Sequence, residues 1–177
     1  MLALMYELSR MFDTAENERQ RYKDLHQASQ YLARVADMTA DAVRWRAAGA
    51  RPGTDSPFDE AQMKVGRRLA IKLLNASKFV LTKSEPRGPV TAALDRGMLT
   101  ALSALVREGT ADLEAYNYTR VLERTESFFW SFCDNYLELI KSRRYGDHGP
   151  ELAGSANSAM LVALSSLLRL FAPFLPF

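Results

Sequence analysis

The chain has 177 residues and a formal net charge of +2, and 47% of its residues are hydrophobic. This size and composition suit a single domain with a substantial core. Because the net charge is so small, any nucleic-acid binding must depend on a local basic patch. The only cysteine, Cys133, excludes an intrachain disulfide and a cysteine-rich zinc site. Within the apolar segment FFWSFCDNY, it is expected to be a small buried side chain.

Two apolar stretches are candidates for a targeting or membrane segment. Residues 1–12 are few and include Glu7 and Arg10, while residues 159–177 are interrupted by Arg169 and two prolines. Neither stretch has the uninterrupted apolar length that a bilayer requires. We therefore expect a cytoplasmic protein without a membrane partner.

Helical periodicity dominates the chain, and no convincing strand-like alternation appears. Glycine and proline clusters, such as GARPGTDSP and the residues around Pro86 and Pro89, separate the periodic segments. Asn117 is expected to cap one helix, and residues 145–154 are expected to form a flexible connection. The expected helices cover residues 2–12, 14–35, 39–48, 57–83, 91–113, 118–143 and 155–171. The fold class predicted from this pattern is an all-α antiparallel helical bundle.

Each expected helix has an apolar row that should face the core. The helix over residues 118–143 has a second apolar patch at Trp130 and Leu137, so it should have two packing partners and lie at the centre of the bundle. The other rows that should face inward consist of Leu69, Ala70, Leu73, Ala76, Val80 and Leu81; Leu94, Met98, Leu102, Leu105 and Val106; Val121, Leu122, Thr125, Phe128, Phe129, Phe132, Tyr136, Leu139 and Ile140; and Met160, Leu161, Leu164, Leu167, Leu168 and Phe171.

The segment VGRRLAIKLLNASKFVL, residues 65–81, has a second, polar row opposite its apolar one. Arg68, Lys72, Asn75 and Phe79 recur at helical spacing and place an aromatic ring among two cations and an amide. Such a ring can stack a nucleic-acid base while the cations contact phosphates. The alternative is a solvated basic face whose phenylalanine lies under a neighbouring helix or loop.

Other basic residues accompany this row. Lys64, Lys78 and Lys83 flank it and could each add a phosphate contact, although general solubility also explains them. Arg143 and Arg144 belong to a basic run at the end of a helix, where compensation of the helix dipole is a sufficient explanation. The alternative for this run, which also includes Lys141, is a contact with the RNA backbone.

Four ordered segments of the chain resemble the valyl-tRNA synthetase family of class I aminoacyl-tRNA synthetases. They are residues 65–81, ADAVRWRAAGARPGTDSPFDEAQ from Ala40, TRVLERTESFFWSFCDNYLELIKSRRY within residues 95–145, and LLRLFAPFLPF at residues 167–177. The string W-x-x-F-C-D-x-Y-L-E is the most specific match. The resemblance implies a leader at residues 1–38 that does not match the family, a junction at 39–57, and an anticodon-binding helical bundle at 58–177.

The resemblance also implies a function. In the family, the helix at residues 65–81 contacts the anticodon loop, so Arg68, Lys72, Asn75 and Phe79 are the expected tRNA-binding residues, with valine tRNA as the partner. The alternative is a detached bundle that serves protein interaction or oligomerisation through residues 1–38, without RNA specificity.

The catalytic signatures of class I synthetases do not occur in the chain. Neither H-I-G-H nor K-M-S-K-S is present, and the two histidines, His26 and His148, are far apart. Glycine-rich phosphate loops and histidine-supported metal sites are not evident either. We expect no catalytic residue, metal or cofactor in this chain, with ATP used only by a catalytic domain that is absent from it. A catalytic synthetase domain in trans is one expected partner, and a chain that acts alone is the alternative. A truncated synthetase and a free-standing module both remain open.

Overall fold

The computed structural model describes residues 40–50, 53, 55, 59–82 and 86–176. All regular elements within this part of the chain are helical, which confirms the expected all-α class. The expected helices at 2–12 and 14–35, and therefore the leader, lie outside the described residues. The elements are α3 (Ala40–Ala48), α4 (Glu60–Leu81), α5 (Ala93–Glu114), α6 (Tyr118–Ser131), the π-helical turn η1 (Phe132–Tyr136), α7 (Leu137–Arg144) and α8 (Pro150–Phe171).

The described residues belong to two compact units that meet within the sequence of α4, between Ala70 and Ile71. The first unit contains α3 and the start of α4, where the backbone N–H of Gln62 donates to Oδ1 of Asp59 at 3.1 Å and so caps the helix. Gly66 permits a close approach of Trp45, because a Cβ at this position would lie 2.9 Å from Cε3 of the indole.

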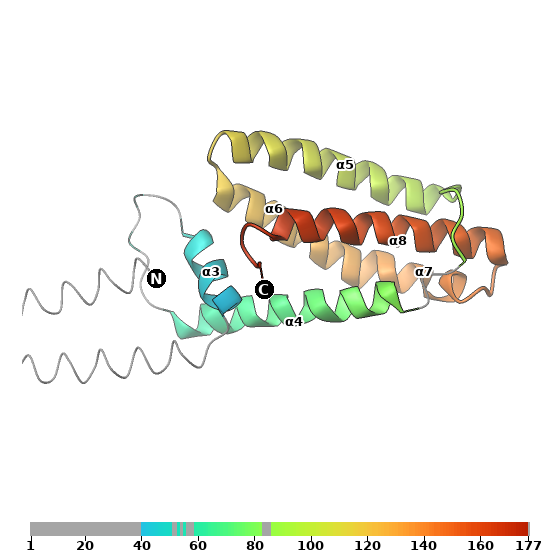
Figure 1. The fold of residues 1–177 in the computed structure, drawn as a ribbon, viewed down its shortest axis with the longest axis horizontal. Coiled ribbons are helices and arrows are strands. Elements are labelled where there is room, and N and C mark those ends of the chain that lie inside the picture. The colour runs from blue at the N-terminus through green and yellow to red at the C-terminus, as the bar shows by residue number, and fades with distance from the viewer. Residues whose placement is uncertain (1–39, 51–52, 54, 56–58, 83–85, 177) are drawn as a thin grey trace, which may run out of the picture. The chain divides into compact units, whose positions relative to one another are not determined.

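The second unit, Ile71–Pro176, is a bundle in which successive helices run in opposite directions. Figure 1 shows α5, the continuous α6–η1–α7 rod and α8 side by side. α5 packs against α6 and α8, and α8 also packs against α6 and α7. α8 therefore contacts all of the other complete helices of this unit.

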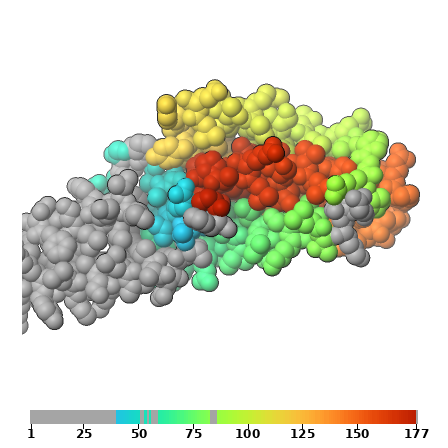
Figure 2. All heavy atoms as spheres, viewed as in Figure 1, coloured from blue at the N-terminus to red at the C-terminus, as the bar shows by residue number. Residues whose placement is uncertain are grey.

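The core of the second unit combines large buried side chains of α6 and α8 with small buried residues of α8. Phe129 and Phe171 are both fully buried and meet edge to face with ring centroids 5.6 Å apart. Small buried residues on α8, including Ala156, Ala159 and Ala163, allow neighbouring helices to approach closely. In Figure 2 the atoms of α5 and α8 meet along the two helices, so side chains fill the space between the ribbons.

The turn between α5 and α6 differs from the expected capping. Asn117 precedes α6, but its side chain makes no capping hydrogen bond. Instead, its backbone N–H donates to the carbonyl of Asp112 at 2.8 Å, and Tyr116 adopts a positive φ of 60° to close the turn. The backbone itself makes this connection, so the side-chain cap predicted at Asn117 is wrong.

The expected helix at 118–143 is continuous but contains the π turn η1. A π turn holds one extra residue, so it shifts the buried row by one position. Leu137 is consequently buried, while Leu139, which was expected to face the core, has 66% of its surface exposed. Tyr136 and Ile140 are buried as predicted, so beyond Phe132 the predicted inward row was wrong at Leu139.

α8 begins at Pro150, five residues before the expected start at Ser155. Pro150 occupies the first turn, where its missing N–H costs nothing, and the preceding Gly149 has a φ of 92°. The segment from Pro150 to Gly154 was expected to be a flexible connection, and this was wrong. α5 also starts later than predicted, at Ala93.

Besides Leu139, three residues expected to face inward are instead exposed. Leu81 lies at the end of α4 with 60% of its surface exposed, Leu94 lies in the first turn of α5 with 45%, and Leu168 lies in the last turn of α8 with 42%. Each is close to a helix end, where the neighbouring elements no longer cover the apolar row. In the first turn of α5, the side chain that is buried is Asp95.

One described helix, α8, has a length and apolar composition that would suit a membrane span. However, 56% of its most apolar window is buried inside the protein. A core helix of a globular bundle has the same composition, because it is covered by neighbouring helices on several sides.

Candidate functional site

The polar row predicted from the sequence lies entirely on α4. Lys72, Asn75 and Phe79 belong to the second unit, and Arg68 belongs to the first. Asn75 is exposed, whereas Lys72 and Phe79 are only partly exposed. The structure thus places Lys72 and Phe79 at the edge of the exposed face, where both contact the α6–η1–α7 rod.

Lys72 is held by two groups from this rod. Its Nζ lies 3.1 Å from Oδ1 of Asp134 and 5.5 Å from the centroid of the Trp130 ring. The side chains of Lys72 and Asp134 remain 40% and 58% exposed, so solvent screens their attraction and the ion pair is weak. A competing phosphate could displace Asp134 at small cost, while the ammonium group would keep its cation–π contact with the Trp130 ring.

Phe79 lies against the guanidinium group of Arg144, which is 4.1 Å from the centroid of its ring. Arg144 reaches this position from the end of α7 and is itself buried, with only 4% of its surface exposed. The alternative drawn from the sequence was that Phe79 lies under a neighbouring helix or loop. The contact with Arg144 agrees with this alternative on one side of the ring. The ring is nevertheless partly exposed, so it also has surface facing solvent.

The remaining predicted residues are exposed on α4, except for one that lies outside the part of the chain that the structure describes. Nε of Arg68 donates to the backbone carbonyl of Lys64 at 3.4 Å, and Nζ of Lys64 lies 3.3 Å from Glu60. Lys78 is exposed. Lys83 lies outside the described residues.

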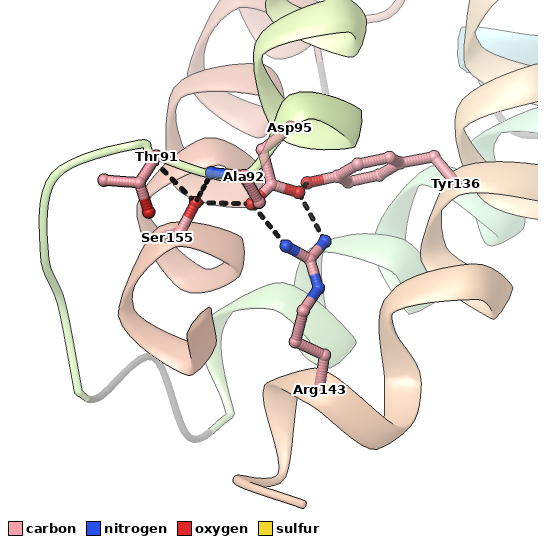
Figure 3. A network of polar contacts seen from close by, with 6 residues as sticks. All are labelled: Thr91, Ala92, Asp95, Tyr136, Arg143 and Ser155. Atoms are coloured by element: carbon pink, nitrogen blue, oxygen red, sulfur yellow. Dashed lines mark hydrogen bonds and ion pairs between the residues drawn. The ribbon is translucent and has the colours of Figure 1, made fainter. Parts of the chain in front are cut away.

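The end of α7 is anchored by a buried polar network centred on Asp95 (Figure 3). The Arg143 guanidinium donates to both carboxylate oxygens, at 2.8 and 2.5 Å, and the Tyr136 hydroxyl donates to Oδ1 at 2.9 Å. The Ser155 hydroxyl donates to Oδ2 at 2.6 Å. Burial, together with the adjacent carboxylate, raises the pKa of Tyr136, so its hydroxyl stays protonated and able to donate.

The same serine connects this network to the start of α5. Ser155 Oγ accepts the backbone N–H groups of Thr91 and Ala92, at 3.1 and 3.2 Å. These N–H groups precede the first turn of the helix, where the backbone has no partners of its own. The network therefore links α5, η1, α7 and α8 through one carboxylate, and it fixes the position of Arg143 and of the adjacent Arg144.

Comparison with known proteins identifies the fold. Residues 95–177 match the family described as the anticodon-binding domain of tRNA ligase. Residues 95–177 are therefore an anticodon-binding domain of the tRNA ligase type. Asp95, the centre of the buried network, is the first residue of the matched region.

The anticodon-binding domain is also similar to a region of valine–tRNA ligases. The chain is 59% identical over 142 residues to the valine–tRNA ligase of Cutibacterium acnes and 53% identical over 152 residues to that of Salinispora arenicola. These matches cover 78% and 82% of the chain, but only 16% and 18% of the relatives. The chain thus spans about a sixth of the length of the relatives it matches.

These similarities include α4, which lies before the matched residues 95–177. A continuous match over 78% of the chain leaves fewer than 40 residues outside it, so a match of this length must contain residues 60–81. A more distant relative, the valine–tRNA ligase of Bifidobacterium longum subsp. infantis, is 43% identical over 160 residues, with 78% of the chain covered.

The sequence did not reveal the roles of Arg143 and Arg144 in the anticodon-binding domain. The sequence explained both by the helix dipole or by a phosphate contact. In the structure, Arg143 forms an ion pair with Asp95, and Arg144 donates to the backbone carbonyl of Thr82 and covers the Phe79 ring. The spacing Asp95–Arg143 spans 48 residues, so helical periodicity gives no signal for it. A charged residue in an otherwise apolar row, as Asp95 is, was the one available indication.

Cys133 is buried as expected, and burial raises the pKa of its thiol to about 11. At pH 8 almost no thiolate is present in the folded domain, so we expect reaction with a disulfide reagent such as dithionitrobenzoate to be at least tenfold slower than in the unfolded chain. Absorbance of the released thiolate, with and without denaturant, measures this ratio. Equal rates would contradict the burial of Cys133.

No group of three His, Cys, Asp or Glu side chains within the described part of the domain lies close enough together to hold a metal ion. The polar network around Asp95 is satisfied by protein groups. The arrangement offers aromatic, amide and cationic groups on α4, which are suited to binding rather than to bond-breaking chemistry.

Proposed function

We propose that the chain binds tRNA, with valine tRNA as its specific partner, through the polar row of α4. The similarity to valine–tRNA ligases over a region that includes α4 is the observation that carries this proposal. Asn75 and Lys72 would read base edges or contact phosphate, and Phe79 would stack a base of the anticodon loop. Arg68, one turn earlier on the helix, would contact the RNA backbone.

The local geometry supports this assignment. Lys72 has a weak, exposed ion pair that a phosphate can replace, and Asn75 is exposed one turn further along α4. Phe79 is held from one side by Arg144 and keeps a partly exposed surface. A ring that is already fixed loses little conformational freedom when a base stacks on it. Lys64 and Lys78 would add contacts to the RNA backbone, and Lys83, two residues after α4 in the sequence, would add another.

Aminoacylation would require a catalytic domain of a tRNA ligase, either in the same polypeptide or as a separate subunit. We propose that the chain contributes tRNA recognition to valyl-tRNA formation, needs no cofactor of its own, and acts in the cytoplasm. ATP would be used only by the catalytic domain.

Titration of the full chain with labelled valine tRNA tests the proposal. We expect Phe79→Ala to weaken binding by about 5-fold to 150-fold, because stacking contributes roughly 1–3 kcal/mol per base. Tyr118→Ala, which removes an aromatic ring that is 37% exposed at the start of α6, is the matched control and should leave the affinity unchanged. Changing the anticodon should also weaken binding to the wild-type chain. Equal affinity for both tRNAs would rule out anticodon recognition.

A second function, protein interaction, is favoured by a different feature of α4. Ile71, Leu74 and Leu81 are apolar but have 48%, 55% and 60% of their surfaces exposed. Apolar residues gathered on one exposed helix face are typical of a protein contact. Under this alternative, Leu74→Ser would abolish association with the partner, while Phe79→Ala would have no effect on function.

A further inference from the structure

Arg144 is the least exposed cation near the polar row of α4. Its guanidinium Nη2 donates to the backbone carbonyl of Thr82 at 2.9 Å and approaches that of Val80 at 3.5 Å. The same guanidinium lies 4.1 Å from the centroid of the Phe79 ring. One side chain therefore contacts the last turn of α4 both through its backbone and through its aromatic residue.

These contacts act where α4 would otherwise be least stable. The last four carbonyl groups of a helix have no partner within the helix, so its terminal turn tends to fray. Arg144 donates to the carbonyl of Val80 in the last turn and to that of Thr82, the residue that follows α4, and so keeps the turn that carries Phe79 in place. Burial lowers the pKa of Arg144 from its ordinary value, which reflects the desolvation that these contacts must offset.

The position of Arg144 is in turn set by its neighbour in sequence. Arg143 donates two hydrogen bonds to the fully buried Asp95, and this pairing anchors the end of α7 to α5. The two adjacent arginines thus fasten the end of α7 to two different helices, α5 and α4. The placement of Phe79 then depends on the buried network as well as on α4 itself.

We propose that Arg144 is a positioning residue that holds the Phe79 ring in the orientation in which it stacks an anticodon base. The proposal rests on the proposed function of the α4 row. With 4% of its surface exposed, Arg144 does not reach RNA itself. Its contribution to binding therefore passes through Phe79, and this distinguishes it from the phosphate contact considered from the sequence.

A double-mutant cycle with valine tRNA tests this assignment. Arg144→Met keeps an aliphatic side chain but removes the guanidinium. We expect it to weaken binding at least about fivefold in the wild-type background and less than about twofold in a Phe79→Ala background, because contacting residues are not additive. Equal losses in both backgrounds, or no loss in either, would overturn the proposal.

The salt dependence of binding provides a second readout. Arg144→Met should leave the slope of log Kd against log salt unchanged, since a residue that contacts no phosphate releases no counterion. A slope reduced by about one would mean that Arg144 contacts phosphate and would overturn the proposal. Lys78→Met, at an exposed cation on the same helix, is the comparison variant for this slope.

Folding and the proposed function are checked separately. Thermal unfolding, monitored by circular dichroism, identifies a temperature at which each variant is folded, and binding is measured at that temperature. If Arg144→Met does not fold, Arg144→Lys replaces it in the double-mutant cycle. Lysine keeps the charge but lacks the planar group that covers the Phe79 ring. If wild-type chain binds valine tRNA and its anticodon-swapped form equally, the proposed function fails. If discrimination is present but the cycle is additive, only the role of Arg144 fails.

Discussion

Replacing Asp95 with alanine is expected to lower the free energy of unfolding by about 3–5 kcal/mol. Asp95 is fully buried and accepts hydrogen bonds from Arg143, Tyr136 and Ser155. Alanine would leave a guanidinium group that is only 11% exposed without its carboxylate, and would leave two hydroxyl donors without their acceptor. Most of the loss comes from this unpaired buried charge rather than from the bonds themselves.

Urea unfolding of the full chain, followed by circular dichroism, measures the effect. Glu123→Ala removes an exposed carboxylate from α6 and is the matched control, with an expected change within about 0.5 kcal/mol. A double variant, Asp95→Ala with Arg143→Met, should recover part of the stability, because it removes the uncompensated charge. A loss below about 1 kcal/mol for Asp95→Ala would show that the network does not stabilise the bundle.

Gly154→Ala is expected to destabilise the domain by up to about 3 kcal/mol, although alanine is the better helix former. Gly154 lies in the first half of α8 and is buried against the loop before α5. A Cβ at this position would lie 3.0 Å from the backbone nitrogen of Gly88 and 3.1 Å from the carbonyl carbon of Arg87. Because these atoms belong to backbone, a rotamer change cannot relieve the contact.

The loop opposite Gly154 has little freedom to move away. The backbone N–H of Gly88 donates to Oγ of Ser158 at 3.2 Å, and Nδ2 of the fully buried Asn157 donates to the carbonyl of Pro86 at 2.9 Å. Ser155 Oγ accepts from Thr91 and Ala92 a few residues later. A shift of the loop would therefore lengthen several hydrogen bonds together.

Gly97→Ala is the matched control for Gly154→Ala. Gly97 also lies within a helix, α5, but nothing lies within 4 Å of a Cβ built at this position. The same substitution should therefore stabilise the domain by about 0.5–1 kcal/mol. Opposite signs in parallel thermal unfolding experiments are the expected result. A stabilising effect at both positions would contradict the close approach of α8 and the loop.

The helices were largely predictable from the sequence because their apolar rows repeat at helical spacing. α4 was expected from residue 57 to 83 and is observed from Glu60 to Leu81, and Leu69, Leu73 and Val80 are buried in it as predicted. The π turn η1 was not predictable, since no residue type specifies it and the helix continues on both sides. The early start of α8 was missed because three glycines around Pro150 indicated a loop.

For the candidate site, the residue types and their spacing were predictable from the sequence, but the groups that contact these residues were not. Lys72 and Phe79 were placed in one polar row, but only tertiary structure put Asp134 and Trp130 beside the first and Arg144 beside the second. These partners are 58 to 65 residues away in sequence, so local periodicity could not indicate them. The RNA-binding role of the row stays a prediction that the tRNA titrations test.

The sequence by itself determined that this chain is an all-helical bundle resembling the anticodon-binding region of valyl-tRNA synthetases. Periodicity within one helix and short ordered strings of residues are local properties, which the sequence displays directly. Only the tertiary structure decided which charges are buried and paired, and which face of α4 is covered. Asp95, Arg143 and Arg144 show the physical reason: a charge enters a core only where partners from distant helices converge on it, and that convergence exists only in the folded chain.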